Sequence, residues 1–301
     1  MSDPSELDPS TFAPPGESSF DLFAERTNLH GTIFAGVAYG VLFAIAFQAL
    51  FLFFQMPRSK IPYRHVAYVA TMLSLATMLF AANARFIQLT FIDLRNFPGG
   101  PNAVSENFYA LPVNILGFFC GITMSWLADG LLVWRFTVIM GNNLWYAVFP
   151  GLILLGSVAT SVVLGIGLFV PQFQTNEWLM INLVNFGIAY WSLSIALNLL
   201  LTTAITARIL LVRRELRGIL GADHAKQYVS VVAMVIESAA LYAVWSLAFL
   251  IAFALHSPIR DMFLPVLGQV QGIAPVLILF RVAQGARVES EYDEQPDGQH
   301  V

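Results

Sequence analysis

The sequence predicts an all-α integral membrane protein, a bundle of seven transmembrane helices with the N-terminus outside and the C-terminus in the cytosol. Composition supports the class, because 57% of the residues are hydrophobic and 11% are charged, and the mean hydropathy is +0.69. A soluble domain needs more polar surface than this chain supplies. The number of apolar stretches and the placement of the basic residues support the helix count and the orientation.

Seven stretches are long and apolar enough to cross a hydrocarbon layer, which takes roughly 20 residues for about 30 Å. They are continuously apolar and lack the alternating pattern of a membrane β-barrel, so helices are expected. The expected spans are Gly31–Phe54, Val66–Ile92, Phe108–Thr137, Tyr146–Val170, Trp178–Val212, Tyr228–Leu255 and Met262–Ala283.

Lysine and arginine follow the topology that the positive-inside rule describes. Of the 15 basic residues, all but four lie in the first, third and fifth connections and the C-terminal tail. Arg26, Arg95 and Arg260 lie on the opposite side, and Arg85 lies within a span. The lipid bilayer is therefore the expected surrounding, in the plasma membrane or an endomembrane.

The two ends of the chain are rich in acidic residues, which predicts disordered tails on either side of the membrane domain. We expect an extracellular tail at residues 1–30, a helical domain at residues 31–284 and a cytosolic tail at residues 285–301.

The connection after the second span combines charge with turn-forming residues in the sequence RFIQLTFIDLRNFPGGPNA. Pro98-Gly99-Gly100-Pro101 predicts a rigid turn that returns the chain over the outer mouth of the bundle. Asp93 would anchor this turn by pairing with Arg85 or Arg95. The alternative is that all three charged side chains only reach toward the headgroups and pair locally.

Two acids lie well inside spans, Asp129 in the third and Glu237 in the sixth. At 1.5 Å per residue both fall roughly 12–14 Å from the cytosolic boundary. Because buried acids are costly unless paired or protonated, we expect an inner polar cluster of Asp129, Glu237 and Asn198. Protonation of an acid, or its pairing with Arg135, would then change the packing of the sixth helix on the third. A static network that fixes helix register is the alternative.

The connection between the fifth and sixth spans is the most basic of the chain. Arg213, Arg214 and Arg217 are expected on a continuation of the fifth helix that ends at Gly218 and Gly221. This segment can dock a cytosolic protein or anionic lipid, or it reflects topology alone.

In the seventh span, Pro265 and Pro275 predict a kinked or locally unwound helix, where Gln269 and Gln271 are candidates to line a cavity.

Three segments, RFIQLTFIDLRNFPGGPNA, DGLLVWRFTVIM and GQVQGIAPVLILFRVAQG, resemble a group of uncharacterised seven-helix membrane proteins from mushroom-forming fungi. The resemblance covers nearly all of the chain between residues 30 and 285. It implies topology and origin, and it implies no activity, ligand or site residues.

Several function classes lack the residues that they need. Retinal binding requires a buried lysine, and Lys60 and Lys226 both lie in cytosolic connections. The five histidines are divided between the two sides, so we expect no metal site, no cofactor and no catalytic residues. Nor does the acidic net charge of -4 favour nucleic acid. We therefore expect a receptor-like or sensor-like protein without enzymatic activity. A small-solute or ion transporter, which could be proton-coupled, is the alternative.

Overall fold

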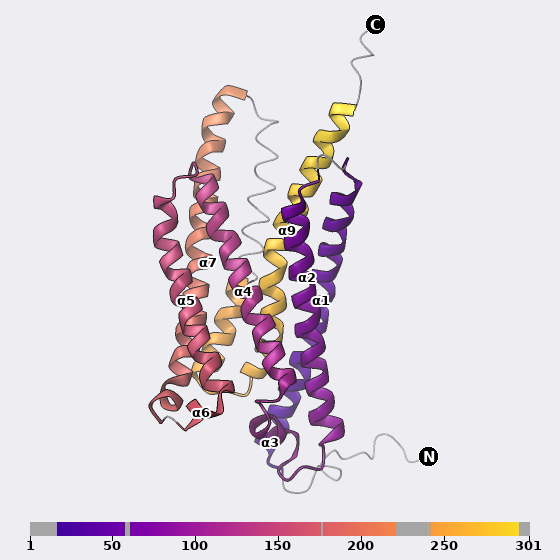
Figure 1. Cartoon of the computed structure of the whole chain (residues 1–301), viewed down its shortest axis with the longest axis vertical. Coiled ribbons are helices and arrows are strands. Elements are labelled where there is room, and N and C mark those ends of the chain that lie inside the picture. The colour runs from indigo at the N-terminus through magenta and orange to yellow at the C-terminus, as the bar shows by residue number, and fades with distance from the viewer. Residues whose placement is uncertain (1–16, 58–60, 176, 221–239, 241, 295–301) are drawn as a thin grey trace, which may run out of the picture.

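The computed structural model describes residues 17–57, 61–175, 177–220, 240 and 242–294, and their regular elements are all helical. The long helices form one elongated bundle (Figure 1). The bounds are α1 Ser19–Gln55, α2 Tyr63–Gln88, the π-helical turn η3 Leu89–Asp93, α3 Gly100–Asn107, α4 Pro112–Ile139, α5 Trp145–Phe169, α6 Pro171–Gln174, α7 Glu177–Leu220 and α9 Arg260–Glu294.

Six of these helical segments are long and apolar enough to cross a membrane, which makes the chain an integral membrane protein. A seventh, shorter apolar helix spans Tyr242–Ala254. It occupies part of the expected sixth span, and the rest of that span lies outside the described residues.

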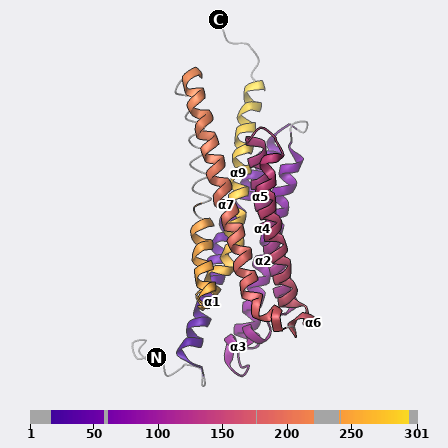
Figure 2. The same cartoon turned by 90° about the vertical axis from the view of Figure 1, so that its left-hand side faces the viewer.

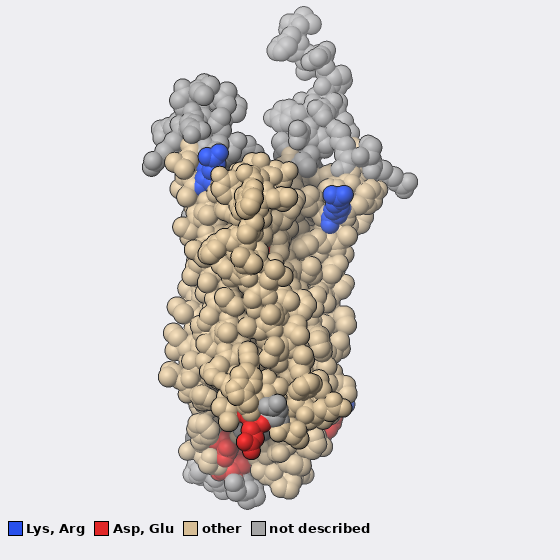
Figure 3. Space-filling view, turned by 60° about the vertical axis from the view of Figure 1, so that its left-hand side comes forward, with Lys and Arg blue, Asp and Glu red and all other residues tan. Residues whose placement is uncertain are grey.

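The two ends of the bundle differ in chain organisation. The short helices α3 and α6 lie at the same end as the starts of α1 and α9, which we call the α3 end (Figures 1 and 2). A broad uncharged surface separates acidic side chains near the α3 end from basic side chains at the opposite end (Figure 3). This uncharged belt is the surface expected to face hydrocarbon.

The predicted N-terminal tail is too long, because α1 begins at Ser19 and not near residue 31. Ser18 and Asp21 form a capping box, in which the Ser18 side chain accepts from the Asp21 amide and Asp21 accepts from the Ser18 amide. The polar residues that indicated disorder are thus the start signal of the helix.

Two further boundaries also differ from the prediction. Helix α9 continues to Glu294, into the expected cytosolic tail, and α7 continues to Leu220, so Gly218 lies inside a helix. A single glycine lowers helix stability by about 1 kcal/mol, which the surrounding helix formers offset. Helix α9 also remains continuous across Pro265 and Pro275, so it is not locally unwound.

The largest apolar core joins α1, α2, α4 and α9. It contains fully buried side chains such as Leu42, Phe53 and Met72, together with Met124 and Val276. A second cluster places Tyr242 and Phe249 against α1 and α9, and a third joins α4 to α7 through Leu132, Leu197 and Leu201.

Candidate functional site

A cavity of about 640 Å³ opens between the helices toward the α3 end. Its lining comes from the start of α1, the last turns of α2, α3, the first half of α4, the last turn of α5 and the first halves of α7 and α9. A volume in this range accommodates a small organic molecule. Every described lining residue lies in the half of the bundle nearer α3. The deepest of them, around Gln271, lie near the middle of the bundle, and we call this the floor of the cavity.

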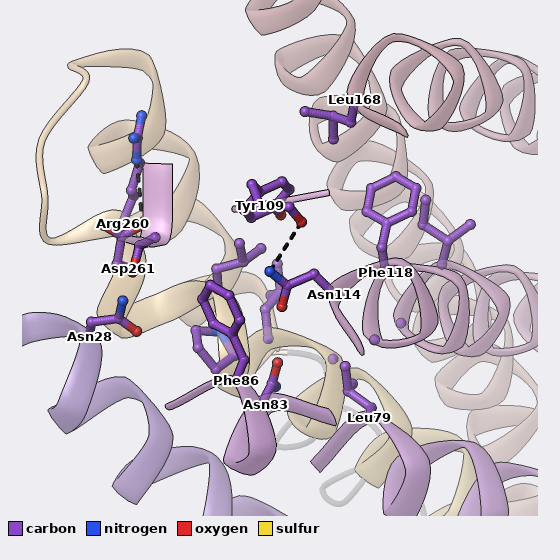
Figure 4. A pocket seen from close by; sticks show the side chains of 18 of the residues that line it. Asn28, Leu79, Asn83, Phe86, Tyr109, Asn114, Phe118, Leu168, Arg260 and Asp261 are labelled. Atoms are coloured by element: carbon purple, nitrogen blue, oxygen red, sulfur yellow. Dashed lines mark hydrogen bonds and ion pairs between the residues drawn. The ribbon is translucent and has the colours of Figure 1, made fainter. Parts of the chain in front are cut away.

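The polar part of the lining is dominated by carboxamides. Figure 4 shows Asn83 of α2 and Asn114 of α4 directed into the same space. Asn114 donates to the Tyr109 carbonyl at 3.1 Å. The Nδ2 of Asn83 is buried and has no hydrogen-bond partner among the described residues. A buried donor without a partner costs about 1–3 kcal/mol, so this amide is available to a ligand.

Aromatic rings and glycines shape the rest of the cavity. Phe86, Phe118 and Trp191 supply ring surfaces. Gly117 and Gly121, on one face of α4, leave room beside them. A Cβ at Gly121 would meet only the two methyl groups of Leu79, both at 3.9 Å. The position can therefore accept a larger side chain, which would occupy the cavity.

The lining contains two charged side chains, Arg260 and Asp261 at the start of α9, and they compensate each other. Arg260 Nε lies 3.5 Å from Asp261 Oδ1, and the two side chains are 40% and 35% exposed. Figure 4 shows them together on one side of the cavity. The described lining thus carries no uncompensated formal charge.

The floor of the cavity is connected to a buried polar network through Gln271. The Nε2 of Gln271 donates to Ser125 Oγ at 2.8 Å and lies 3.5 Å from Ser194 Oγ. Ser194 in turn donates to Asp129 Oδ2 at 2.8 Å and lies 2.9 Å from the Tyr242 hydroxyl. One chain of contacts therefore joins α9, α4, α7 and the helix Tyr242–Ala254.

Asp129 is the acidic member of this network, and it is 1% exposed. Its Oδ2 accepts from Ser194, whereas its Oδ1 has no hydrogen-bond partner among the described residues. The expected partner Glu237 lies outside those residues. The hydrogen bond to Asp129 therefore comes from the hydroxyl of Ser194 on α7, and not from the carboxamide of the predicted partner Asn198.

The two described members of the predicted inner cluster, Asp129 and Asn198, are not hydrogen-bonded to each other. Asn198 is 6% exposed and lies one turn beyond Ser194 on the same face of α7. Arg135 lies two turns beyond Asp129 along α4, close enough to His65 of α2 for electrostatic interaction. No ion pair between Arg135 and Asp129 occurs in the structure.

Polar residues recur along α7 at every fourth position from the cavity toward the opposite end. Since residues four apart share a helix face, they form one row, which we call the α7 polar row. It consists of Tyr190, Ser194, Asn198, Thr202 and Thr206. The first four are buried, and the hydroxyl oxygen of Thr206 is buried as well.

The loop after α2 forms a turn, and Asp93 pairs with Arg85, one of its two predicted partners. Arg85 Nη1 lies 3.2 Å from Asp93 Oδ2, and Arg95 lies near Glu25 of α1. Gly99 and Gly100 have φ values of 89° and 70°, which favour glycine. They start α3, and Asn102 of α3 both lines the cavity and donates to Asp21 of α1 at 3.3 Å.

The two candidate glutamines of α9 have different environments. Gln271 lines the cavity, whereas Gln269 is fully buried and donates to the Ala76 carbonyl of α2 at 3.1 Å. Arg213, Arg214 and Arg217 lie on the helical extension of α7, and their side chains are outside the described part of the structure.

Sequence reasoning missed the residues that connect the cavity to Asp129, namely Ser125, Ser194 and Tyr242. For Ser194 the fourfold spacing of the α7 polar row was an available signal, whereas Ser125 and Tyr242 lie on other helices. No protein-family model, curated protein or solved structure matches this chain.

Proposed function

We propose that the protein is a seven-helix receptor or sensor that binds a small molecule in the cavity without transforming it. One observation carries this proposal: the cavity is open toward the α3 end, and its described lining stops at the floor around Gln271. In this conformation the cavity can hold a ligand, and its described lining gives the ligand no path to the other side.

In this proposal the α3 end faces the outside or a lumen, with seven helices crossing the membrane. The distribution of the described basic residues supports the orientation. Four lie toward the α3 end (Arg26, Arg85, Arg95 and Arg260), and eight lie toward the opposite end: Arg64, Arg135, Arg208, Arg213, Arg214, Arg217, Arg281 and Arg287. Positively charged residues favour the cytosolic side of a membrane. A ligand would then arrive from outside, and the Gln271 contacts would pass its effect to α4 and α7.

A cysteine-labelling experiment tests both the closed floor and the orientation. The single cysteine, Cys120, is first replaced by alanine. Three single-cysteine variants follow: Asn114→Cys in the cavity, Asn198→Cys beyond its floor, and Leu144→Cys in the connection at the opposite end, which is 75% exposed. Intact and permeabilised cells are treated with a charged thiol reagent that does not cross membranes.

In intact cells we expect labelling of Asn114→Cys alone. After permeabilisation we expect Leu144→Cys to react as well, while Asn198→Cys stays unlabelled. Labelling of Leu144→Cys and not Asn114→Cys in intact cells would reverse the orientation. Labelling of Asn198→Cys in intact cells would contradict the closed floor.

The α7 polar row favours a second candidate, a small-solute or proton-coupled transporter. A row of buried hydroxyl and carboxamide groups that continues past the cavity floor can hold water or pass a proton between states of the bundle. Asp129 would be its acidic group. Reactivity of Asn198→Cys from both sides of the membrane is the result that this alternative requires.

A further inference from the structure

We propose that the cavity binds an uncharged ligand with a flat apolar body and an amide or hydroxyl head group that reaches the floor. This inference rests on the proposed function, because it names the chemical class of the ligand in the same cavity. Three properties of the lining carry it: the charge, the polar groups at depth and the aromatic walls.

The charge of the lining selects against ions. Arg260 and Asp261 neutralise each other near the start of α9, and Asp129 lies below the floor, outside the lining. Transfer of an ion from water into such a site costs several kcal/mol unless a fixed charge compensates it. A neutral molecule avoids this penalty.

The polar groups of the lining select for a ligand that both donates and accepts hydrogen bonds. The buried Nδ2 of Asn83 offers a hydrogen bond that no described residue takes. At the floor, Gln271 uses its Nε2 for Ser125, so its carbonyl oxygen can accept from a ligand. A carboxamide presents a donor and an acceptor in either of its two orientations. Amides and alcohols match this pair, whereas a hydrocarbon would leave both groups without partners.

The walls select for a flat apolar body. Phe86 and Phe118 face the space from α2 and α4 (Figure 4). Trp191 adds a ring from α7, and it is held edge-to-face against Phe249 with ring centroids 4.6 Å apart. Aromatic side chains fixed in this way offer stacking surfaces at little entropic cost. On α4, Gly117 and Gly121 leave space beside Phe118.

Occupancy of the floor would also act on the buried network. Of the two contacts of Gln271 Nε2, the one with Ser194 is longer, at 3.5 Å against 2.8 Å for Ser125. A head group that turns the Gln271 side chain would break the Ser194 contact first. Ser194 joins Asp129 to Tyr242, so a ligand at the floor can alter how α7 packs on α4.

Three probes of one shape and different charge test the ligand class: phenylpropanamide, phenylpropanoate and phenylpropylammonium. Binding to the purified full chain in nanodiscs is measured by saturation-transfer NMR. We define specific binding as the binding that is lost in the Gly121→Leu variant, because a leucine at this position would fill the cavity. Gly130→Leu is the matched control on α4, since a Cβ at Gly130 meets nothing within 4 Å and Gly130 is not a lining residue.

We expect specific binding of the amide and at least about tenfold weaker binding of both ions, equivalent to about 1.4 kcal/mol. Asn83→Leu should weaken amide binding about tenfold, the usual effect of losing a buried hydrogen bond. Gly130→Leu should leave amide binding within about twofold, as expected for a distant independent site.

Tighter specific binding of either ion would overturn the ligand class and leave a ligand-binding cavity in place. Absence of Gly121-sensitive binding for all three probes would also overturn the class. Neither result bears on the closed floor, which the labelling of Asn198→Cys decides. Failure of the ligand class and failure of the proposed function are therefore distinguishable.

Discussion

The two sides of the bundle are built from different interactions. Where α1, α2 and α9 meet, the buried side chains are apolar, and Gln269 donates to a backbone carbonyl of α2. Where α4 and α7 meet near the cavity, Asp129, Ser194 and Tyr242 form a hydrogen-bonded network. The buried part of the first side is mainly apolar, and the second side collects buried polar side chains that can exchange partners.

This difference indicates which side can respond to a ligand. Packing between apolar helices in a membrane depends on shape, so a change there lowers stability without offering a second stable arrangement. A network of hydroxyl, carboxamide and carboxylate groups can re-form with other partners at small cost. We therefore expect substitutions on the α1–α9 side to have the largest effects on stability. Substitutions on the α4–α7 side should affect both stability and the response of the bundle to a ligand.

The largest loss of stability is expected for Gly31→Val on the α1–α9 side. A Cβ at Gly31 would lie 2.5 Å from the Asp261 carbonyl oxygen and 2.9 Å from the Met262 Cα. Backbone atoms cannot move aside as a side chain can, so the helices must separate. We expect a loss of about 2–3 kcal/mol in the free energy of unfolding, in the upper range for overpacking.

Gly40→Val is the matched control for Gly31→Val. It lies on the same helix, and a Cβ there meets nothing within 4 Å. Its effect should stay within about 0.5 kcal/mol. Thermal unfolding of both variants in the same detergent provides the comparison. Equal melting temperatures for the two variants would show that close contact at Gly31 does not hold α1 to α9.

On the α4–α7 side, Ser194→Ala should cost less, about 1–3 kcal/mol, because it leaves buried polar partners unsatisfied. The affected groups are Asp129 Oδ2 and the Tyr242 hydroxyl. Ser157→Ala is the control: Ser157 is also fully buried, but its Oγ has no hydrogen-bond partner among the described residues. Chemical unfolding should show a loss for the first variant and little change for the second. The reverse order would contradict a stabilising network.

Sequence reasoning could identify the membrane class and most helices because both depend on long-range averages of apolar character. It could also pair Asp93 with an arginine close to it in sequence, although it left Arg85 and Arg95 as alternatives, and the structure has the pair with Arg85. Helix ends were less predictable. The capping box at Ser18 is a local signal inside a segment whose overall composition indicated disorder.

The cavity itself could be predicted only in part. Gln269 and Gln271 were equivalent candidates by sequence, and the rotation of α9 against α2 and α4 decided between them. Asn83 and Ser194 gain their roles from neighbours on other helices, and no local pattern encodes those contacts. The α7 polar row is the exception, because its fourfold spacing is visible in the sequence.

The smallest expected effect concerns the ion pair that the loop sequence predicted. Arg85 and Asp93 are 55% and 46% exposed, so water screens their attraction. A double-mutant cycle with Arg85→Gln and Asp93→Asn should give a coupling energy of about 0.2–1 kcal/mol. Thermal unfolding at low and high salt measures it, and the coupling should fall at an ionic strength of about 1 M, where the screening length is about 3 Å. A coupling energy above this range that does not fall with salt would mean that the pair holds α3 over the cavity mouth. The loop would then act with the α4–α7 side, where substitutions are expected to change the response to a ligand.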